Sequence, residues 1–236
     1  MTTNDISRIL EDWPYEPGKL NVRIFEIDSG RAVLQLRMEM GVVQMELHGR
    51  PDGIDQDGFS SLLELYETRG THGGLNSDVC RRLREEGVQR SHRAAALFSI
   101  NRWEDVIRDC NRNLELFDLC KLHANEEHDR EALEQFRAPV ITLRTRSAAE
   151  WAISIENTIE AMSAIDQGIE LLEEVLGDDS EESNEMQLLL GMKEALVPRL
   201  PTSERADLKE RLASAIKNEN YELAAILRDE IRLLRD

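Results

Sequence analysis

Residues 95–116, AALFSINRWEDVIRDCNRNLEL, contain two amphipathic helical segments joined by a short polar turn at residues 101–103. Small residues and a leucine line the first segment. Four apolar residues recur at helical spacing in the second segment and mark its buried face: Val106, Ile107, Cys110 and Leu114. The stretch therefore predicts a helical hairpin within a mostly helical region.

The same apolar pattern returns 55 residues further along the chain. Eight positions of the first hairpin have a counterpart in the second: Ala94/Ala149, Leu97/Ala152, Ile100/Ile155, Val106/Ala161, Ile107/Met162, Cys110/Ile165, Leu114/Ile169 and Leu116/Leu171. Repeated helix pairs stack their apolar faces and leave a groove that can bind another protein. We therefore expect residues 59–176 to form an α-helical repeat body.

The repeating unit resembles the tetratricopeptide repeat, a helix–turn–helix unit of about 34 residues. The longer spacing here predicts overlong helices near residues 104–124 and 128–155. The glycine and tyrosine that the family carries at its turn are replaced by other residues, which are Asn101 and Trp103 in the first unit and Glu156 and Thr158 in the second. The resemblance implies a degenerate helical scaffold whose groove is a protein-binding surface.

In residues 1–58, apolar residues recur at every second position instead of at helical spacing. Apolar Leu34, Leu36 and Met38 alternate with polar side chains in one segment, and Val43 and Met45 do so in the next. This alternation predicts a small antiparallel β-meander with one apolar and one solvated face, the apolar face being covered by a helix such as 59–69. A short helix is expected over residues 5–13, before Pro14.

Residues 203–236, SERADLKERLASAIKNENYELAAILRDEIRLLRD, form an antiparallel helical hairpin of a different kind. Leucine and isoleucine recur at helical spacing on both sides of a polar turn at residues 218–220. Two helices of about four turns bury too little apolar area to be stable alone, so a partner is expected.

This hairpin resembles the UVR motif, which occurs in the excision-repair subunits UvrB and UvrC and in some regulators of bacterial Clp proteases. The matching steps are Asn220-Tyr221-Glu222, Ala224-Ala225 and Leu227-Arg228-Asp229-Glu230-Ile231. Asn220 stands where the family more often has an acid, and Tyr221 replaces a frequent phenylalanine. The resemblance covers about a seventh of the chain and implies protein–protein contact, in which such hairpins pair with like hairpins.

Nine hairpin residues are the expected contacts of the partner: Leu212, Ile216, Tyr221, Ala224, Ala225, Leu227, Arg228, Asp229 and Ile231. The paired alanines permit close approach of a helix, and Arg228 beside Asp229 offers charges that fix its register. The partner is another protein with a UVR-like or helical hairpin, or a second copy of this chain. Alternatively, the hairpin forms the last docked helices of the chain's own domain.

The formal net charge of −18 disfavours direct binding of nucleic acid by the whole surface, because acidic groups repel a phosphate backbone. No apolar run approaches membrane-spanning length, and we expect a cytoplasmic bacterial protein without a membrane partner. Cysteines at Cys80, Cys110 and Cys120 fit a reducing compartment. An acidic, turn-rich break at 177–183 and two prolines, Pro198 and Pro201, bound a connecting helix.

Cys120, His123 and His128 lie close in sequence and could ligate a metal. A structural zinc site needs four ligands, however, and no second pair of cysteine or histidine residues lies nearby in the sequence. The five histidines are scattered and accompany no nucleophile signature. The glycine-rich residues 71–74 lack the lysine of a phosphate-binding loop. We therefore expect no catalytic residue, no metal and no cofactor.

These observations predict an α+β, mostly α fold with four parts. They are a β-meander (1–58), tetratricopeptide-like helical repeats (59–176), an acidic linker with a connecting helix (177–202) and a UVR-like helical hairpin (203–236). The expected function is that of a non-enzymatic adaptor. Alternatives are an accessory factor that recruits nucleotide-excision-repair subunits or a regulator of a Clp-type protease. An enzyme with its site between the meander and the helices would require a deep pocket with converging polar groups.

Overall fold

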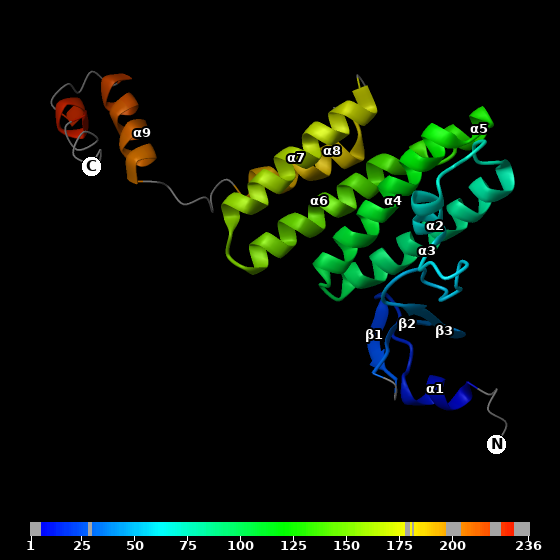
Figure 1. The fold of residues 1–236 in the computed structure, drawn as a ribbon. Helices are drawn as coiled ribbons and strands as arrows, with labels where there is room; N and C mark the ends of the chain where they lie inside the picture. Colours follow the sequence, from blue (N-terminus) through cyan, green and yellow to red (C-terminus); the bar gives the residue numbers. More distant parts are fainter. Residues whose placement is uncertain are drawn as a thin grey trace. The chain divides into compact units, whose positions relative to one another are not determined.

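The computed structural model describes residues 6–27, 30–177, 180, 182–196, 204–217 and 223–228 (Figure 1). The chain divides into two compact units, Met1–Lys193 and Glu194–Asp236. Helices make up most of the described residues, and a three-stranded antiparallel sheet precedes the long ones. The predicted α+β, mostly α fold is confirmed.

The sheet is a meander with the strand order β1-β2-β3, formed by β1 (Asn21–Glu26), β2 (Ala32–Met38) and β3 (Gly41–Glu46). Leu34 in the central strand lies opposite Ile24 on one side and Met45 on the other, so these side chains share one face. That apolar face joins the core of the helical body, where helix α3 (Ser77–Ser99) packs against β1. The short helix α1 (Ser7–Asp12) precedes the sheet.

The opposite face of the central strand is covered, whereas the sequence pattern predicted a solvated face. Gln35 and Arg37 are each only 7% exposed. Arg37 Nε donates a hydrogen bond to the Trp13 carbonyl oxygen at 2.9 Å, and the Arg23 guanidinium lies 4.1 Å from the centre of the Trp13 ring. Because long arginine side chains bury their stems and stack on aromatic rings, the N-terminal segment closes over this polar face. Met38, which was predicted to lie on the apolar face, is 49% exposed.

Helix α2 (Leu62–Arg69) begins at a capping box that its sequence encodes. The Ser61 hydroxyl accepts a hydrogen bond from the Glu64 backbone N–H at 3.1 Å, and the Glu64 carboxylate accepts one from the Ser60 N–H at 2.8 Å. These contacts satisfy two backbone donors at the start of the helix. α2 packs against α3 and α4, and α3 is the helix that packs against β1.

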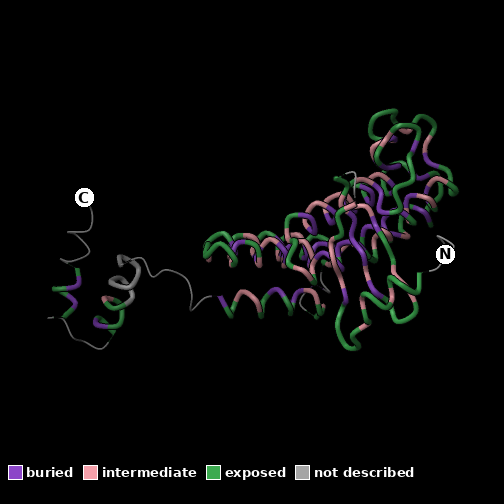
Figure 2. The backbone as a smooth tube through the Cα atoms, turned by 90° about the horizontal axis from the view of Figure 1, so that it is seen from below, coloured by how far each residue is buried: buried purple, intermediate pink, exposed green. Residues whose placement is uncertain are grey.

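Two helical hairpins form the body: α3 with α4 (Trp103–His123), and α6 (Arg137–Ser154) with α7 (Thr158–Leu176). α4 packs against α6, which places the hairpins side by side (Figure 1). Buried and exposed positions alternate along each of these helices (Figure 2). Helix α8 (Asn184–Leu196) follows, and its Lys193 forms an ion pair with Asp166 of α7 at 2.6 Å.

The segment between the hairpins differs from the prediction of one overlong helix over 128–155. The chain instead forms α5 (Glu127–Glu131), a 3₁₀ turn labelled η1 (Glu134–Phe136) and then α6. Pro139 lies in the first turn of α6, where a missing backbone N–H costs no helical hydrogen bond. A proline at this position favours a helix start here over a continuous helix.

The turns of the two hairpins have the same geometry. Asn101 and Glu156, which are 55 residues apart, both have a φ of 60°. The Arg102 N–H donates to the Leu97 carbonyl at 3.1 Å, and the equivalent Asn157 N–H donates to the Ala152 carbonyl at 2.9 Å. The positive φ lets each helix end in a tight left-handed turn.

Replacing Glu156 by glycine is expected to raise the free energy of unfolding by about 0.5–1 kcal/mol, because glycine adopts a positive φ without a Cβ penalty. Asn101→Gly should have a smaller effect, since asparagine tolerates this conformation better than glutamate. Urea denaturation of the full chain measures both changes. If Glu156→Gly were less stable than the unaltered chain, the positive φ of Glu156 would not be a source of strain.

Within the described ranges, no helix is long and apolar enough to cross a membrane.

Candidate functional site

The C-terminal hairpin has an apolar interior of its own. Its first helix is α9 (Glu204–Lys217), and residues 223–228 of the second segment are also helical. Ala215, Ala224 and Leu227 are 4%, 9% and 1% exposed and form one cluster, against which Leu212 packs. These side chains therefore hold the two helical segments together.

A second set of apolar side chains lies on the outside of the hairpin. Ile216, Leu223 and Ile226 are 53%, 40% and 55% exposed. Leu223 and Ile226 are three residues apart, so they lie on one helical face, and the small Ala225 beside them is exposed as well. Large aliphatic side chains gathered at a surface mark a site that another protein can cover.

The nine residues predicted to contact a partner fall into three groups. Leu212, Ala224 and Leu227 contribute to the interior of the hairpin, whereas Ile216, Ala225 and Arg228 are exposed. Tyr221, Asp229 and Ile231 lie outside the described residues. Sequence reasoning missed Leu223 and Ile226, although their i, i+3 spacing beside Ala224 and Leu227 was a detectable signal of a second apolar stripe.

In the body, buried ion pairs join α3, α4 and the end of the sheet. Arg93 donates from Nε and Nη2 to the two carboxylate oxygens of Asp109, both at 2.7 Å, and from Nη1 to the Glu46 carbonyl at 2.7 Å. Both partners of the pair are 1% exposed. Paired, planar contacts of this kind fix the geometry of the elements that they connect.

A second buried pair holds the start of α2. The fully buried Glu86 carboxylate accepts a hydrogen bond from the Leu62 N–H at 2.8 Å and one from Arg90 Nη2 at 2.6 Å. Burial, the largest influence, lowers the pKa of the Arg90 guanidinium. Because the carboxylate lies at the N-terminus of α2, the helix dipole stabilises its charge.

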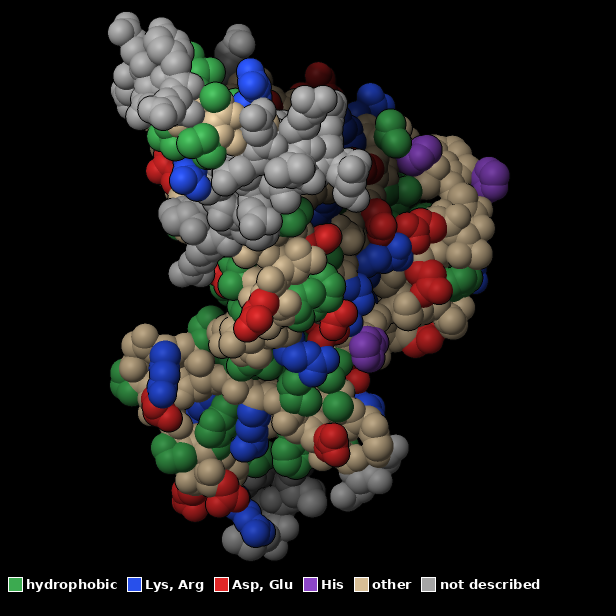
Figure 3. Space-filling model, turned by 90° about the vertical axis from the view of Figure 1, so that its left-hand side faces the viewer, with side chains coloured by type: hydrophobic (Ala, Val, Ile, Leu, Met, Phe, Trp, Pro, Cys, Tyr) green, Lys and Arg blue, Asp and Glu red, His purple; other side chains and the backbone are tan. Residues whose placement is uncertain are grey.

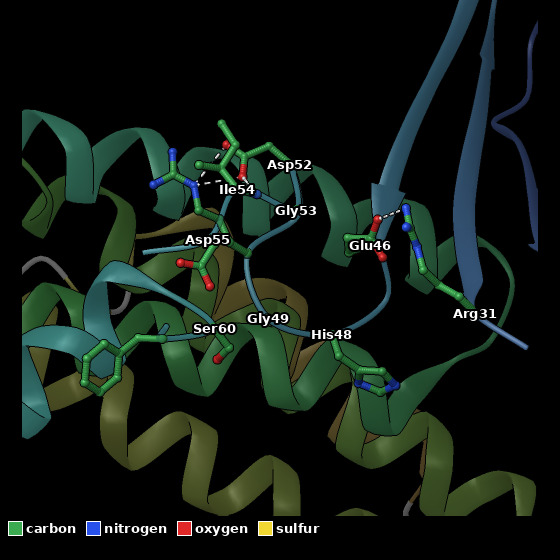
Figure 4. A pocket seen from close by; sticks show the side chains of 11 residues that line it. Arg31, Glu46, His48, Gly49, Asp52, Gly53, Ile54, Asp55 and Ser60 are labelled. Atoms are coloured by element: carbon green, nitrogen blue, oxygen red, sulfur yellow. Dashed lines mark hydrogen bonds and ion pairs between the residues drawn. The ribbon is translucent and has the colours of Figure 1, made fainter. Parts of the chain in front are cut away.

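A surface cavity of about 490 Å³ lies between the end of β3 and residues 48–60 (Figure 4). Its polar side chains bond to one another: Arg31 pairs with Glu46, and Arg50 Nε donates to both oxygens of Asp52 at 2.9 Å. Burial alone would raise the pKa of Asp52, but hydrogen bonds from the Ile54 N–H and from the Gln89 and Arg50 side chains lower it. The mutual pairing favours a structural role for these groups.

The candidate metal ligands are not brought together. Cys120 is fully buried, whereas His123 and His128 are exposed. Burial raises the pKa of the Cys120 thiol to about 12, and that of Cys110 likewise to about 12. Among the described residues, no group of three or more histidine, cysteine, aspartate or glutamate side chains is arranged to hold a metal ion.

The surface carries both signs of charge. Basic and acidic side chains are interspersed over the face that Figure 3 shows, although acids outnumber bases by 47 to 29 in the sequence. A basic stripe of the kind that tracks a nucleic-acid backbone is not visible on this face.

Fold and surface together describe a small sheet and a helical body followed by a helical hairpin with exposed apolar side chains. A family model described as the UvrB/uvrC motif matches residues 202–236, which are the hairpin. The motif is found in nucleotide-excision-repair and Clp-related proteins, where it mediates protein–protein interactions. No family model supports the tetratricopeptide-like body, and no curated protein or solved structure matches the chain.

Proposed function

We propose that this protein is a non-enzymatic adaptor that docks a partner through the outer face of its C-terminal hairpin. The observation that carries this proposal is that some apolar residues of the hairpin are buried in its interior while others are exposed on its surface. Ala215 and Leu227 are used to hold the hairpin together, while Ile216, Leu223 and Ile226 are exposed. The match of the same segment to the UVR motif supports it independently.

Docking occurs by burial of helix against helix. Full burial of an exposed leucine or isoleucine contributes about 1.5–3 kcal/mol, so three such side chains supply a large part of the free energy of a micromolar complex. The small side chain of Ala225 permits a partner helix to approach closely. The partner is another protein with a UVR-like or helical hairpin, or a second copy of this chain.

Charge helps to select the partner. Residues 203–236 carry eight acids and seven bases, a net charge of −1, which leaves −17 of the total −18 on residues 1–202. A partner with basic side chains around its docking face is therefore attracted to this protein, whereas an acidic one is repelled. The nearly neutral hairpin itself imposes no repulsion on a like hairpin.

Two pathways are consistent with the motif, and the identity of the partner distinguishes them. Recruitment of nucleotide-excision-repair subunits would place this chain in DNA repair without direct contact with DNA. Binding of a Clp-type protease, or of a regulator linked to it, would place the chain in regulated proteolysis. Recovery of one or the other set of proteins with the tagged chain decides between these two.

Removal of residues 203–236 is expected to abolish partner capture while leaving the first unit folded. The measurement is quantitative mass spectrometry of proteins that co-purify with the tagged full chain and with the tagged chain ending at residue 202. Circular dichroism and the thermal melting temperature of the shortened chain serve as the folding control. Equal recovery of partners by both chains would place the docking surface outside the hairpin.

A further inference from the structure

A second surface cavity lies in the helical body, where the turn of the first hairpin meets α6. Its volume is about 790 Å³. The lining residues come from the turn of the first hairpin and from α6, and they are Phe98, Ser99, Asn101, Trp103, Arg146, Glu150, Trp151, Ile153 and Ser154. None of the described residues of the docking hairpin lines the cavity. The cavity therefore needs an explanation separate from partner docking.

Aromatic rings form one wall of this cavity. Phe98 and Trp103 meet edge to face, with ring centroids 5.0 Å apart and an interplanar angle of 69°. Trp151 also lines the cavity and is 37% exposed. Tryptophan is among the side chains that contribute most to binding when a ligand covers them, so this wall suits a large apolar group.

Arg146 lines the cavity, and its guanidinium forms no ion pair with an acidic side chain among the described residues. Its guanidinium lies over the Phe98 ring, 4.9 Å from the ring centre. Its Nε is enclosed without a hydrogen-bond acceptor, and no ion pair connects Arg146 to any described residue. Two arginines of the first hairpin do have such partners, in the pairs Arg93–Asp109 and Arg102–Asp105.

Glu150 lines the same cavity one helical turn after Arg146. Side chains four residues apart on a helix are placed to form an ion pair. Nevertheless, the described part of the chain shows no ion pair between Arg146 and Glu150, and the Arg146 guanidinium lies over the Phe98 ring. Two opposite charges thus stand one turn apart beside the aromatic wall, each able to accept a counter-charge from a ligand.

We propose that this cavity binds a free α-amino acid with a large apolar side chain. Arg146 takes the carboxylate, since a planar guanidinium pairs with it through two parallel hydrogen bonds. Glu150 takes the ammonium group, and the rings of Trp103 and Trp151 cover the apolar side chain. A zwitterion has no net charge, so the acidic surface of the protein does not repel it, as it would a simple anion.

The test measures the binding of L-phenylalanine and of L-leucine to the full chain. Binding is detected by the change in tryptophan fluorescence and by isothermal calorimetry. Saturable binding of one or both is expected. Arg146→Met and Glu150→Gln should each weaken this binding at least tenfold, because each removes a charge-assisted contact. The matched control is Arg144→Met on the same helix, whose guanidinium donates to Asn111 at 3.4 Å and which should bind as the unaltered protein does.

Two analogues separate a free amino acid from the end of a peptide. N-acetyl-L-phenylalanine lacks the ammonium group and L-phenylalaninamide lacks the carboxylate, and each should bind at least tenfold more weakly than phenylalanine. Equal binding of the acetylated compound would overturn the proposal in favour of a peptide C-terminus. Absence of binding of either amino acid up to about 10 mM, a concentration that detects even millimolar affinity, would also overturn it, as would full affinity in Arg146→Met with an unchanged circular dichroism spectrum.

Discussion

Asp109→Ala is expected to destabilise the first unit by about 3–5 kcal/mol, because it leaves a buried guanidinium without its counter-charge. Asp109 and Arg93 are each 1% exposed, and the carboxylate receives two hydrogen bonds of 2.7 Å from the guanidinium. Arg93 also donates to the Glu46 carbonyl at the end of β3. The substitution therefore weakens the contact between α3 and α4 and the attachment of the sheet at once.

Urea denaturation followed by circular dichroism measures this loss. The double variant Arg93→Met, Asp109→Leu should recover most of the stability, since it removes both charges and leaves side chains of similar volume. Arg81→Ala is the matched surface control: Arg81 pairs with Asp78 and Glu85 but is 53% exposed, so its loss should lower the stability far less than Asp109→Ala does. A loss below about 1 kcal/mol in Asp109→Ala would mean that the pair does not hold the body together.

The second large effect is expected in the hairpin. Ile216→Asp combined with Ile226→Asp should reduce partner capture at least tenfold, because two carboxylates would be buried without counter-charges on docking. These side chains are 53% and 55% exposed, so the free hairpin should keep its helices. Leu227→Asp is the contrasting variant: Leu227 is 1% exposed within the hairpin, and a charge there should unfold the hairpin itself.

Much of the fold follows from local patterns in the sequence. The alternation around Leu34 sets the central strand, and the equivalent apolar positions on either side of Asn101 and Glu156 set two helical hairpins with the same turn. Such patterns depend on residues a few positions apart, which is why they can be read without coordinates. The bounds of α4 lie within one residue of the predicted 104–124, whereas α6 begins at Arg137 and not at residue 128 as predicted.

The departures from prediction arise from contacts between distant residues. The burial of Arg37 depends on the Trp13 carbonyl, 24 residues earlier, and no local pattern announces that contact. The Arg93–Asp109 pair likewise unites charged residues that the sequence presents as ordinary surface positions of two helices. In an acid-rich chain, local charge patterns do not reveal which carboxylate is buried with which base.

In the candidate site, too, the sequence pattern does not reveal which residues contact one another. The sequence identified the hairpin and its apolar residues, but assigned Leu212, Ala224 and Leu227 to the partner, although the hairpin uses them for its own interior. A two-helix unit needs one apolar stripe to pack its helices against each other and a second apolar stripe to bind a partner. Periodicity detects both stripes but does not say which of them faces the neighbouring helix.

The account depends on the outer face of the hairpin being the docking surface, and one comparison tests this most directly. The tagged full chain, its Ile216→Asp, Ile226→Asp variant and a control with Ile159→Asp, an isoleucine of α7 that is 63% exposed, are each used to recover partners for quantitative mass spectrometry. We predict at least a tenfold loss of the partner in the hairpin variant and full recovery in the control. Full recovery by the hairpin variant, with its helical content unchanged, would contradict the account.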